Sequence, residues 1–449
     1  MTGTSPGRGW LLRLIIAFAF AQGAVSMARP AVSYRALALG ADARAVGVIA
    51  GVYALLPLFA AVPLGRRTDH GRAAPLLPVG VVLIAGGCAL SGRAGSLSAM
   101  ALWSGVMGLG HLVFVIGAQS IVARRSATAD QDRNFGHFTV GASLGQLIGP
   151  IVAGLLVSAH DGQLDRTSAL ALSVSAGTAL CACVGLWRLE SAGAGTSPAP
   201  RAGGGRAAGR PAPVWGIVRS RGVASGIFIS LAVLSTTDVL TAYLPVLGEH
   251  RGIAPATVGL LLSLRAAASI ACRLVMTPMI RVIGRTALMA GSCLLAALLC
   301  ASIAVPLPVW ALAVVLALLG FALGVGQPLS MSTVVRAAPE GARSTALALR
   351  LTGNRFGQAA APAGAGVLAG LAGPAAPFVL LALLLFGSAA VAGRGLRHEG
   401  ASRTAARSAP RSAPTTDRPT PDSPPPAPPA PGVPTTPRPC EDPASPPGR

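Results

Sequence analysis

Charged side chains inside apolar segments are the residues of this chain whose chemistry stands out. Asp238, in LSTTDVLTAYLP, is the only acid deep within an apolar run, and four arginines interrupt or border other runs: Arg29, Arg265, Arg350 and Arg355. Ionisable groups are costly inside a bilayer, so they usually face a cavity or a partner. A carboxylate among guanidinium groups can load and release a proton, and the surplus positive charge can bind an anion. Salt bridges that hold one conformation are the third interpretation.

Uncharged polar groups lie in the same segments. His111, in GLGHLVFVIG, can titrate near neutral pH, or it can be a buried histidine bonded to a carbonyl. Several amides can hydrogen-bond to a substrate or between helices: Gln119, Gln146, Gln327, Asn354 and Gln358. Arg350 and Arg355 can instead act as gate or anchor residues near one end of their segment.

The composition is that of a membrane protein. Hydrophobic residues make up 52% of the chain and charged residues 11%, against roughly 25% charged in soluble domains. The formal charge of +21 does not indicate nucleic-acid binding, because the arginines lie at segment ends and in the tail rather than on one basic face. Neither a metal-binding cluster, a nucleotide-binding loop nor a nucleophile triad is present in the sequence. We therefore expect no cofactor, no metal site and no catalytic residue.

Twelve windows are apolar over the length of about 20 residues that a bilayer-spanning helix needs. They lie at 11–32, 44–64, 75–91, 97–121, 135–158, 168–188, 222–247, 255–278, 286–305, 308–333, 346–370 and 375–393. The eleven later spans indicate that the first is a retained helix and not a signal peptide. The expected fold class is an all-α integral membrane protein with 12 transmembrane helices.

The chain repeats itself at an offset of 212 residues (353 − 141). Residues of GASLGQLIGPIVAG (141–154) recur in GNRFGQAAAPAGAG (353–366), and the matching pairs are Gly141 with Gly353, Gly145 with Gly357, Gln146 with Gln358, Pro150 with Pro362 and Gly154 with Gly366. The same offset relates Gly47 to Gly259 and Gly108 to Gly320. A repeat of this size predicts two pseudo-symmetric six-helix bundles.

Composition divides the chain into four parts. We expect an N-terminal six-helix bundle over residues 1–189, a flexible cytoplasmic linker over 190–218, a C-terminal six-helix bundle over 219–393, and a disordered Pro/Ser/Arg-rich tail over 394–449. Arginines are roughly twice as frequent in the loops of one side as in those of the other. The positive-inside rule then places both termini in the cytoplasm.

The two sets of six spans, the long central loop and GRRTDHGR between the second and third spans resemble the major facilitator superfamily of secondary transporters. The residues that match the family's loop signature, roughly G-x-L-a-D-R-x-G-R, are Gly65, Asp69, Gly71, Arg72, Gly284 and Arg285. The chain departs from that signature at His70 and at Arg281, which stands where the second half would carry the acid. The resemblance implies that Asp69 latches the halves together in one state. A solvated acid that caps a turn is the alternative.

The stretch 141–154 also resembles the family's helix-five element gxxxGPxxGG, which is associated with antiporters. Gly145, Gly149, Pro150 and Gly154 match it, and Ala153 replaces the penultimate glycine. Small residues four apart let helices approach closely, and proline bends a helix. We expect this element and its counterpart (Gly141, Gly353, Gly357, Pro362, Gly366) to form mobile interfaces between the halves. Tight packing with no transport role is the alternative.

Together these features predict a bacterial inner-membrane, multi-pass secondary transporter, not an enzyme, that works by alternating access. The helix-five resemblance favours proton-coupled efflux of a drug or metabolite, with the proton gradient as the energy source. An importer or proton symporter of a small organic anion, using Arg29 and Arg265, stays open, as does a non-transporting sensor or scaffold. We expect an Arg29–Asp238 pair across the cavity, a small-molecule substrate and the lipid bilayer as partners, a monomeric state, and no nucleic acid.

Overall fold

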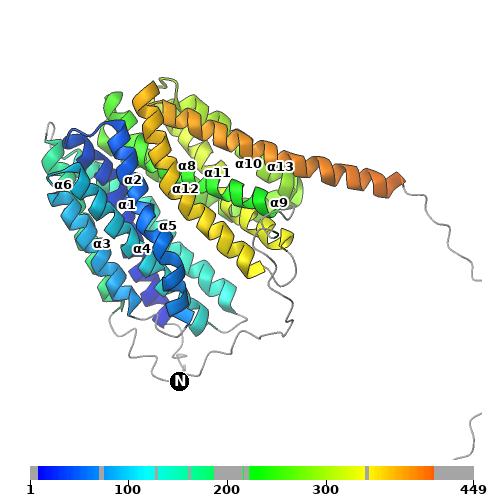
Figure 1. Cartoon of the computed structure of the whole chain (residues 1–449), viewed down its shortest axis with the longest axis horizontal. Helices are drawn as coiled ribbons and strands as arrows, with labels where there is room; N and C mark the ends of the chain where they lie inside the picture. Colours follow the sequence, from blue (N-terminus) through cyan, green and yellow to red (C-terminus); the bar gives the residue numbers. More distant parts are fainter. Residues whose placement is uncertain are drawn as a thin grey trace, which may run out of the picture. The chain divides into compact units, whose positions relative to one another are not determined.

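The computed structural model describes residues 9–69, 75–126, 130–159, 163–186, 216, 222–338 and 343–408. The first half contributes α1 (Gly9–Ala38), α2 (Ala43–Asp69), α3 (Leu76–Arg93), α4 (Leu97–Arg125), α5 (Gln131–Val157) and α6 (Leu164–Leu186) (Figure 1). The second contributes α8 (Val223–His250), α9 (Pro255–Ile283), α10 (Arg285–Ile303), α11 (Val309–Ala337), α12 (Arg343–Ala372) and α13 (Ala376–Ser408). The chain divides into two compact units, residues 1–399 and 400–449.

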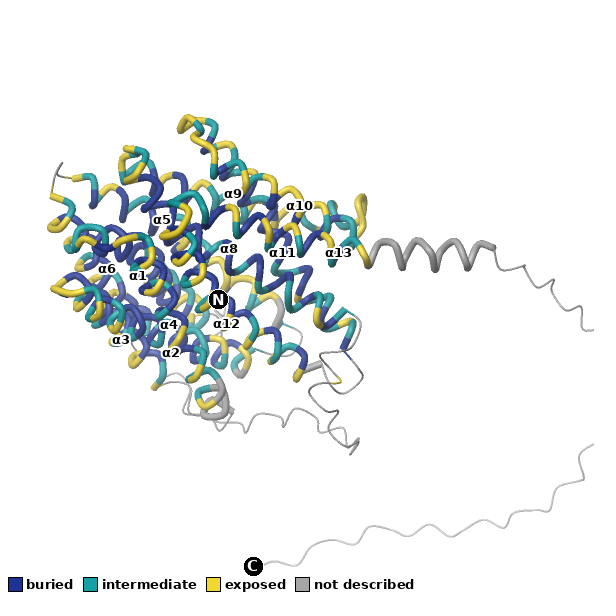
Figure 2. The backbone as a smooth tube through the Cα atoms, turned by 45° about the horizontal axis from the view of Figure 1, so that its top comes forward, coloured by how far each residue is buried: buried dark blue, intermediate teal, exposed yellow. Residues whose placement is uncertain are grey.

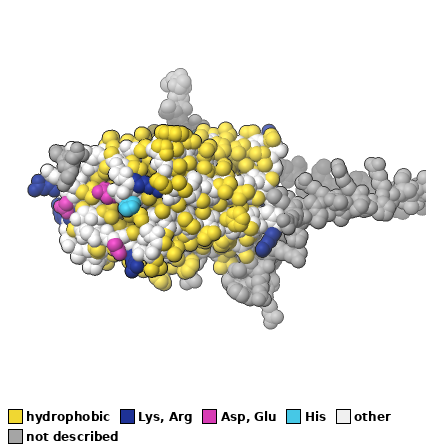
Figure 3. All heavy atoms as spheres, turned by 90° about the horizontal axis from the view of Figure 1, so that it is seen from above, with side chains coloured by type: hydrophobic (Ala, Val, Ile, Leu, Met, Phe, Trp, Pro, Cys, Tyr) yellow, Lys and Arg dark blue, Asp and Glu magenta, His cyan; other side chains and the backbone are white. Residues whose placement is uncertain are grey.

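Eleven of the described helices are long and apolar enough to cross a membrane. Helix α12 falls short of that length and hydropathy because Asn354, three arginines and a run of alanine and glycine lower its hydropathy. It still packs against α8 as α5 packs against α1, so it holds the equivalent place in its half. Large apolar side chains such as Phe59, Val184 and Leu274 are exposed, and Figure 3 shows a face on which hydrophobic side chains predominate. The all-α membrane fold predicted from the sequence is confirmed.

Helices α1 and α8 are the most deeply buried of their halves, and Figure 2 shows their long buried stretches in dark blue. In the N-terminal half α1 packs against α5 and α6, while α4 packs against α2 and α3. In the C-terminal half α8 packs against α12, and α11 packs against α9 and α10. The pairing of α1 with α5 thus recurs as α8 with α12, and the pairings of α4 with α2 and α3 recur as α11 with α9 and α10. A side chain on α1 or α8 is therefore placed where the two halves share their interior.

The repeat extends to single contacts. A Cβ added at Gly141 would lie 2.7 Å from the carbonyl oxygen of Ile15, and one added at Gly353 would lie 2.9 Å from the side chain of Ile227. Ile15 and Ile227 are themselves 212 residues apart. Equivalent glycines thus admit equivalent helices, α1 and α8, at the same place in each half.

The 212-residue offset also relates the contacts between the halves: each contact has an equivalent one in which the two halves have changed places. Gly47 of α2 faces Gly366 of α12, with an added Cβ 2.9 Å from the opposing Cα, and Gly259 of α9 faces Gly154 of α5 at 3.1 Å. Helix α2 thus pairs with α12 as α9 pairs with α5. A twofold relation between two bundles requires this exchange.

The glycine-proline motif divides between two kinds of interface. Gly154 and Gly366 face the opposite half. Five of its glycines instead face α1 or α8 of their own half: Gly141, Gly145, Gly149, Gly353 and Gly357. The prediction that the whole motif lies between the halves is wrong for these five. Their role is to let α5 and α12 approach the central helix of the same bundle, since any side chain there would meet its backbone or side chains.

Hydrogen bonds join the halves at one end of the unit, which we call the closed end (residues 41–51, 150–159, 243–259 and 359–372). The Tyr243 hydroxyl lies 2.9 Å from the carbonyl oxygen of Ala43 on α2 and 3.2 Å from that of Pro362 on α12, and donates to one of them at a time. Arg44 Nη2 donates to the carbonyl of Gly370 at 3.2 Å. In Figure 1 the ribbons of α2 and α12 approach each other at this end.

We expect Tyr243→Phe to loosen the closed end. Removing the hydroxyl deletes its hydrogen bond between the halves, which contributes about 1 kcal/mol, or roughly a fivefold shift in the opening equilibrium. The measurement is the rate at which an impermeant maleimide labels a cysteine at Ala50 from the closed-end side of oriented proteoliposomes. Tyr34→Phe is the matched control, because the buried Tyr34 hydroxyl has no hydrogen-bond partner within the described residues. Equal labelling rates for the two variants would contradict this role.

The predicted domain boundaries are only partly covered by the described residues. The linker expected over 190–218 is described at Gly216 alone. Helix α13 continues past the expected boundary at 393 to Ser408, which corrects the start of the tail, because the alanines and arginines that follow favour helix. Residues 409–449 of the predicted tail lie outside the described residues.

Candidate functional site

An ion pair joins the central helices of the two halves. Arg29 Nη1 of α1 lies 2.5 Å from Asp238 Oδ1 of α8. Asp238 is only 4% exposed, and its Oδ2 has no hydrogen-bond partner within the described residues. The predicted Arg29–Asp238 pair is confirmed. Because α1 and α8 are equivalent helices, the pair links the centres of the two bundles.

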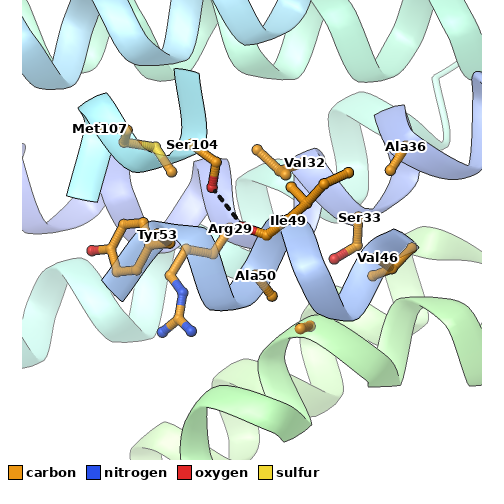
Figure 4. Close-up of a pocket in the computed structure, with 11 residues that line it drawn as sticks. Arg29, Val32, Ser33, Ala36, Val46, Ile49, Ala50, Tyr53, Ser104 and Met107 are labelled. Atoms are coloured by element: carbon orange, nitrogen blue, oxygen red, sulfur yellow. Dashed lines mark hydrogen bonds between the residues drawn. The ribbon is translucent and has the colours of Figure 1, made fainter. Parts of the chain in front are cut away.

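A chain of hydrogen bonds extends from this pair into the N-terminal half. The Arg29 guanidinium lies 5.1 Å from the centroid of the Tyr53 ring, close enough for a cation–π contact, and Figure 4 shows the two side by side. The Tyr53 hydroxyl is 2.8 Å from His111 Nδ1, and His111 Nε2 is 3.0 Å from Gln22 Oε1. Gln22 Nε2 in turn donates to Ser26 at 3.2 Å.

This chain is complete with a neutral His111. A glutamine Oε1 only accepts hydrogen bonds, so His111 Nε2 carries a proton, and in the neutral imidazole Nδ1 accepts from the Tyr53 hydroxyl. Both ring nitrogens of a neutral imidazole are thereby satisfied. His111 is a neutral link that orients Tyr53, which corresponds to the buried-histidine interpretation of the sequence with side chains in place of a carbonyl.

Arg265 and Tyr53 occupy equivalent positions in the two halves. An added Cβ at Gly320 of α11 would overlap the main-chain carbonyl of Arg265 on α9, and one at Gly108 of α4 would overlap that of Tyr53 on α2. The offset of 212 relates both pairs. The close helix crossings therefore hold a guanidinium on one side of the site and a phenol on the other. Arg265 makes no hydrogen bond or ion pair with any described residue, and its Nε is buried.

Positive charge exceeds negative charge around Asp238. Arg29, Arg265 and Arg355 all interact electrostatically with this carboxylate, while Arg355 makes one hydrogen bond, to Gln358 Oε1 at 3.1 Å. Among the described residues this arrangement sets one carboxylate against three guanidiniums. In a poorly solvated interior an uncompensated guanidinium is unfavourable. The site has the charge of a receptor for an anion.

Arg350, Gln327 and Asn354 form a second cluster inside the C-terminal half. Arg350 Nη2 donates to Gln327 Oε1 at 2.6 Å, Gln327 Nε2 donates to the Ser230 carbonyl at 3.0 Å, and the Ser230 hydroxyl donates to Asn354 Oδ1 at 2.8 Å. Arg350 is 6% exposed. This cluster ties α8, α11 and α12 together within one bundle, so Arg350 fits the anchor interpretation.

Aromatic rings fill the equivalent place in the N-terminal half. Phe18 and Phe138, the counterparts of Ser230 and Arg350 under the 212-residue offset, stack with centroids 4.3 Å apart and planes 3° from parallel. At this place an aromatic stack holds the helices of the N-terminal bundle together, and hydrogen bonds from a guanidinium hold those of the C-terminal bundle together. The sequence repeat alone does not reveal this difference, because it marks the glycines and not the polar residues.

The remaining predicted residues lie apart from both clusters. Gln119 is exposed on α4 and makes no hydrogen bond within the described residues. Of the loop signature, Gly71 and Arg72 lie outside the described residues, and Gly65 and Asp69 lie in the last turns of α2. Gly284 ends α9 with a φ of 85°, which favours glycine, and Arg285 donates to Ser332 Oγ of α11 at 2.5 Å.

An apolar cavity borders the ion pair on the side of the closed end. It lies between α1, α2, α4 and α8, and its lining includes Arg29, Val32, Ile49, Tyr53, Met107 and Ala242 (Figure 4). Tyr53 and Gln22 are the residues that sequence reasoning missed. The signal for Tyr53 was its equivalence to Arg265. Within the described residues no three potential metal-ligating side chains gather.

Comparisons with known proteins identify the fold. The family model of the Major Facilitator Superfamily matches residues 14–254 and 227–434. Solved structures with the same fold include the nucleoside transporter NupG (15% identity, 86% of this chain, 98% of that chain, TM-score 0.65). A bacterial homolog to the human lysosomal transporter Spinster, inward-facing and unoccupied, is 13% identical (87% of this chain, 97% of that chain, TM-score 0.68). A POT family transporter in complex with 5-aminolevulinic acid is 15% identical (85% and 94%, TM-score 0.69). No curated protein sequence matches the chain.

Proposed function

The chain belongs to the Major Facilitator Superfamily and is a membrane transporter, and from this premise we propose that it is a proton-coupled secondary transporter in which Asp238 carries the proton. The observation that carries the proposal is the Arg29–Asp238 ion pair between the central helices of the two halves. Protonation would neutralise Asp238 and remove its attraction for Arg29, so the bond between the bundles would weaken at their centre. Deprotonation would restore it. Coupling arises because the same carboxylate binds the proton and joins the halves.

Alternating access uses the glycine crossings. Gly47 with Gly366 and Gly154 with Gly259 form two equivalent contacts on which the bundles rock. Under the proposed orientation, with both termini in the cytoplasm, the closed end faces the outside. We retain Asp69 as the proposed latch on the cytoplasmic side. A monomeric unit is part of the proposal.

Arginines at the closed end support this orientation. Three of the five arginines in the loops on the closed-end side (Arg35, Arg44, Arg93, Arg166 and Arg251) make contacts within the protein. Arg35 of α1 pairs with Asp165 of α6, Arg44 donates to the Gly370 carbonyl, and Arg251 donates to the carbonyl oxygens at the end of α10. Their positions follow from packing and not from membrane topology. The arginine excess on the other side then stands out more clearly.

Export by proton antiport is the first candidate direction. The helix-five element favours it, and Pro150 and Gly154 of this element lie at the contact with Gly259, where the halves meet. The inner membrane is the expected location. A drug or metabolite is the expected substrate of this candidate.

Proton symport of an organic anion is the second candidate, and the unpaired guanidinium of Arg265 favours it. A sensor or scaffold without transport is the alternative of another class. Deleting residues 400–449 separates this alternative from both transporters, because transport should survive the deletion and signalling should not.

Proton flux in proteoliposomes tests the proposal. A trapped pH-sensitive dye reports proton movement when ethidium or carboxyfluorescein, probes of opposite charge, is added across an imposed pH gradient. We expect wild type to couple one of them to proton flux and Asp238→Asn to lose that coupling by about tenfold or more. Asp165→Asn is the matched control, since Asp165 is a 63% exposed carboxylate that pairs with Arg35 inside one half. Unchanged proton flux in Asp238→Asn would contradict the assignment.

A further inference from the structure

We propose that the site binds an amphipathic organic carboxylate, with its carboxylate against Arg265 and Arg355 and its apolar body beside the Tyr53 ring. This inference names the substrate class of the proposed transport site, and it rests on the proposed function only in taking that site as the one between the halves. It does not depend on the direction of transport.

The charge balance demands an anion. Asp238 neutralises one guanidinium, Arg29, at 2.5 Å, and this leaves Arg265 and Arg355 without a carboxylate among the described residues. Arg265 also interacts unfavourably with Arg29. Solvation cannot fully offset such charges in a membrane interior, so a bound anion would stabilise the site. A cationic substrate would add to the repulsion.

Free hydrogen-bond donors indicate a carboxylate. A guanidinium presents five N–H donors in a planar fork that matches the two oxygens of a carboxylate. Arg265 uses none of its donors on a described residue, and Arg355 donates only to Gln358 Oε1. The donors of Arg350, by contrast, are directed to Gln327 and Ser330. Arg265 and Arg355 are therefore available to a ligand, whereas Arg350 is committed to its own bundle.

The difference between the two halves at one pair of equivalent positions sets the orientation of the proposed ligand. The equivalent crossings at Gly108 and Gly320 place Tyr53 on the α2 side and Arg265 on the α9 side. Next to Tyr53 lies the cavity, whose lining from α1, α2, α4 and α8 is mostly apolar. A ligand with its carboxylate towards α9 therefore has its body beside the Tyr53 ring and aliphatic side chains. Such a body can be aromatic, because Tyr53 offers a ring face or edge for stacking.

Anion binding and proton binding are linked at Asp238. The charged and titratable groups around it are Arg29 on α1, Tyr53 on α2, His111 on α4, Arg265 on α9 and Arg355 on α12. A carboxylate that engages these guanidiniums competes with Asp238 for them. Under the proposed function the anion therefore replaces the Asp238 carboxylate beside the guanidiniums while Asp238 holds its proton. Occupancy of the site by the anion and the proton together favours the symport candidate over antiport.

Ligand-induced thermal stabilisation of the purified full chain tests the inference. The probes are 2-naphthoate, its neutral analogue 2-naphthamide, and acetate, which has the carboxylate without the body. We expect 2-naphthoate to raise the melting temperature in a concentration-dependent manner and the other two to leave it unchanged. Equal shifts with 2-naphthamide would overturn the proposal, as would equal shifts with acetate.

Arginine variants locate the site. Arg265→Gln should weaken 2-naphthoate binding about tenfold or more, whereas Arg281→Gln, an exposed arginine at the end of the same helix, should not. Without ligand Arg265→Gln should melt at or above the wild-type temperature, because it removes an unpaired charge. A lower melting temperature together with intact 2-naphthoate binding would assign Arg265 a structural role and overturn the proposal. Should Arg265→Gln fail to fold, Arg355→Gln provides the same comparison.

Proton uptake separates this inference from the proposed function. Adding 2-naphthoate to the weakly buffered protein should raise the pH of the solution in wild type and not in Asp238→Asn. Binding without proton uptake in wild type would refute Asp238 as the proton carrier and leave the carboxylate site standing. Proton-coupled flux of ethidium without any 2-naphthoate binding would refute the carboxylate site and leave Asp238 as the proposed proton carrier.

Discussion

Asp238→Asn is expected to destabilise the protein more than Arg29→Gln, although the two residues form one ion pair. Removing Asp238 leaves Arg29, whose side chain is 19% exposed, among other guanidiniums without a carboxylate. Breaking a buried pair in this way costs about 3–5 kcal/mol. Removing Arg29 leaves Asp238 beside Arg265 and Arg355, which already interact with it and can replace the lost partner. We therefore expect Arg29→Gln to cost about half as much or less.

The double variant Arg29→Gln/Asp238→Asn completes the cycle. Its free energy of unfolding should be closer to that of wild type than the sum of the single effects, because both charges are removed together. The measurement is reversible unfolding of each variant in detergent micelles. Asp165→Asn serves as the control, since Arg35 keeps its hydrogen bonds to the carbonyls of Ala94 and Asp165. If the single variants were both as stable as wild type, the pair would not join the halves in an energetically relevant way.

Gly47→Ala and Gly259→Ala are expected to shift the protein away from the described conformation without unfolding it. A Cβ at Gly47 would overlap the Tyr243 hydroxyl and the Pro362 carbonyl, and one at Gly259 would overlap the Pro150 carbonyl. Overpacking of this kind costs about 1–3 kcal/mol. The halves can relieve it by separating at the closed end, so the opening equilibrium should shift about tenfold.

Labelling of a cysteine at Ala50 measures this shift, and two glycines provide matched controls. Gly364→Ala should be neutral, since nothing lies within 4 Å of the added Cβ on the same helix as Gly366. Gly145→Ala should lower the melting temperature instead, because Gly145 packs against α1 of its own half. Identical behaviour of Gly47→Ala and Gly145→Ala would mean that the interfaces between and within halves do not differ in function.

The fold was predictable because its determinants are local and repeated. Apolar length fixes the spans, and small residues recur where helices cross closely, so the offset of 212 residues found the equivalent helices before any contact was known. The partner of each crossing was not predictable from that offset. The offset shows that Gly145 and Gly357 are equivalent. It does not show whether they pack within their own half or against the opposite half, because both arrangements satisfy the same spacing.

The charged residues of the site were predictable, because burying a charge is costly and such residues are rare in apolar spans. Its neutral residues were not predictable on this ground. The Arg29–Asp238 pair followed from the scarcity of acids in apolar spans and from the equivalence of the first and seventh spans. Tyr53 and Gln22 were not predicted, because a phenol and an amide cost little in a helix, and only Tyr53 is marked by the repeat, as the counterpart of Arg265. Arg350 was grouped with the site although its donors are directed to Gln327 in its own bundle. Only the structure shows which guanidinium donates hydrogen bonds within its own bundle and which has unused donors.

Distances between spin labels on α5 and α9 test the rocking of the two halves most directly. These helices meet at Gly154 and Gly259, so Ala159 and Ala254 lie at the closed end, and Arg133 and Val282, both exposed, lie at the other. Labels are placed on each pair in a variant without its seven native cysteines. On addition of 2-naphthoate at low pH, the distance between 159 and 254 should lengthen while that between 133 and 282 shortens. Two distances that stay fixed, or that change in the same direction, would contradict alternating access by two rigid bundles.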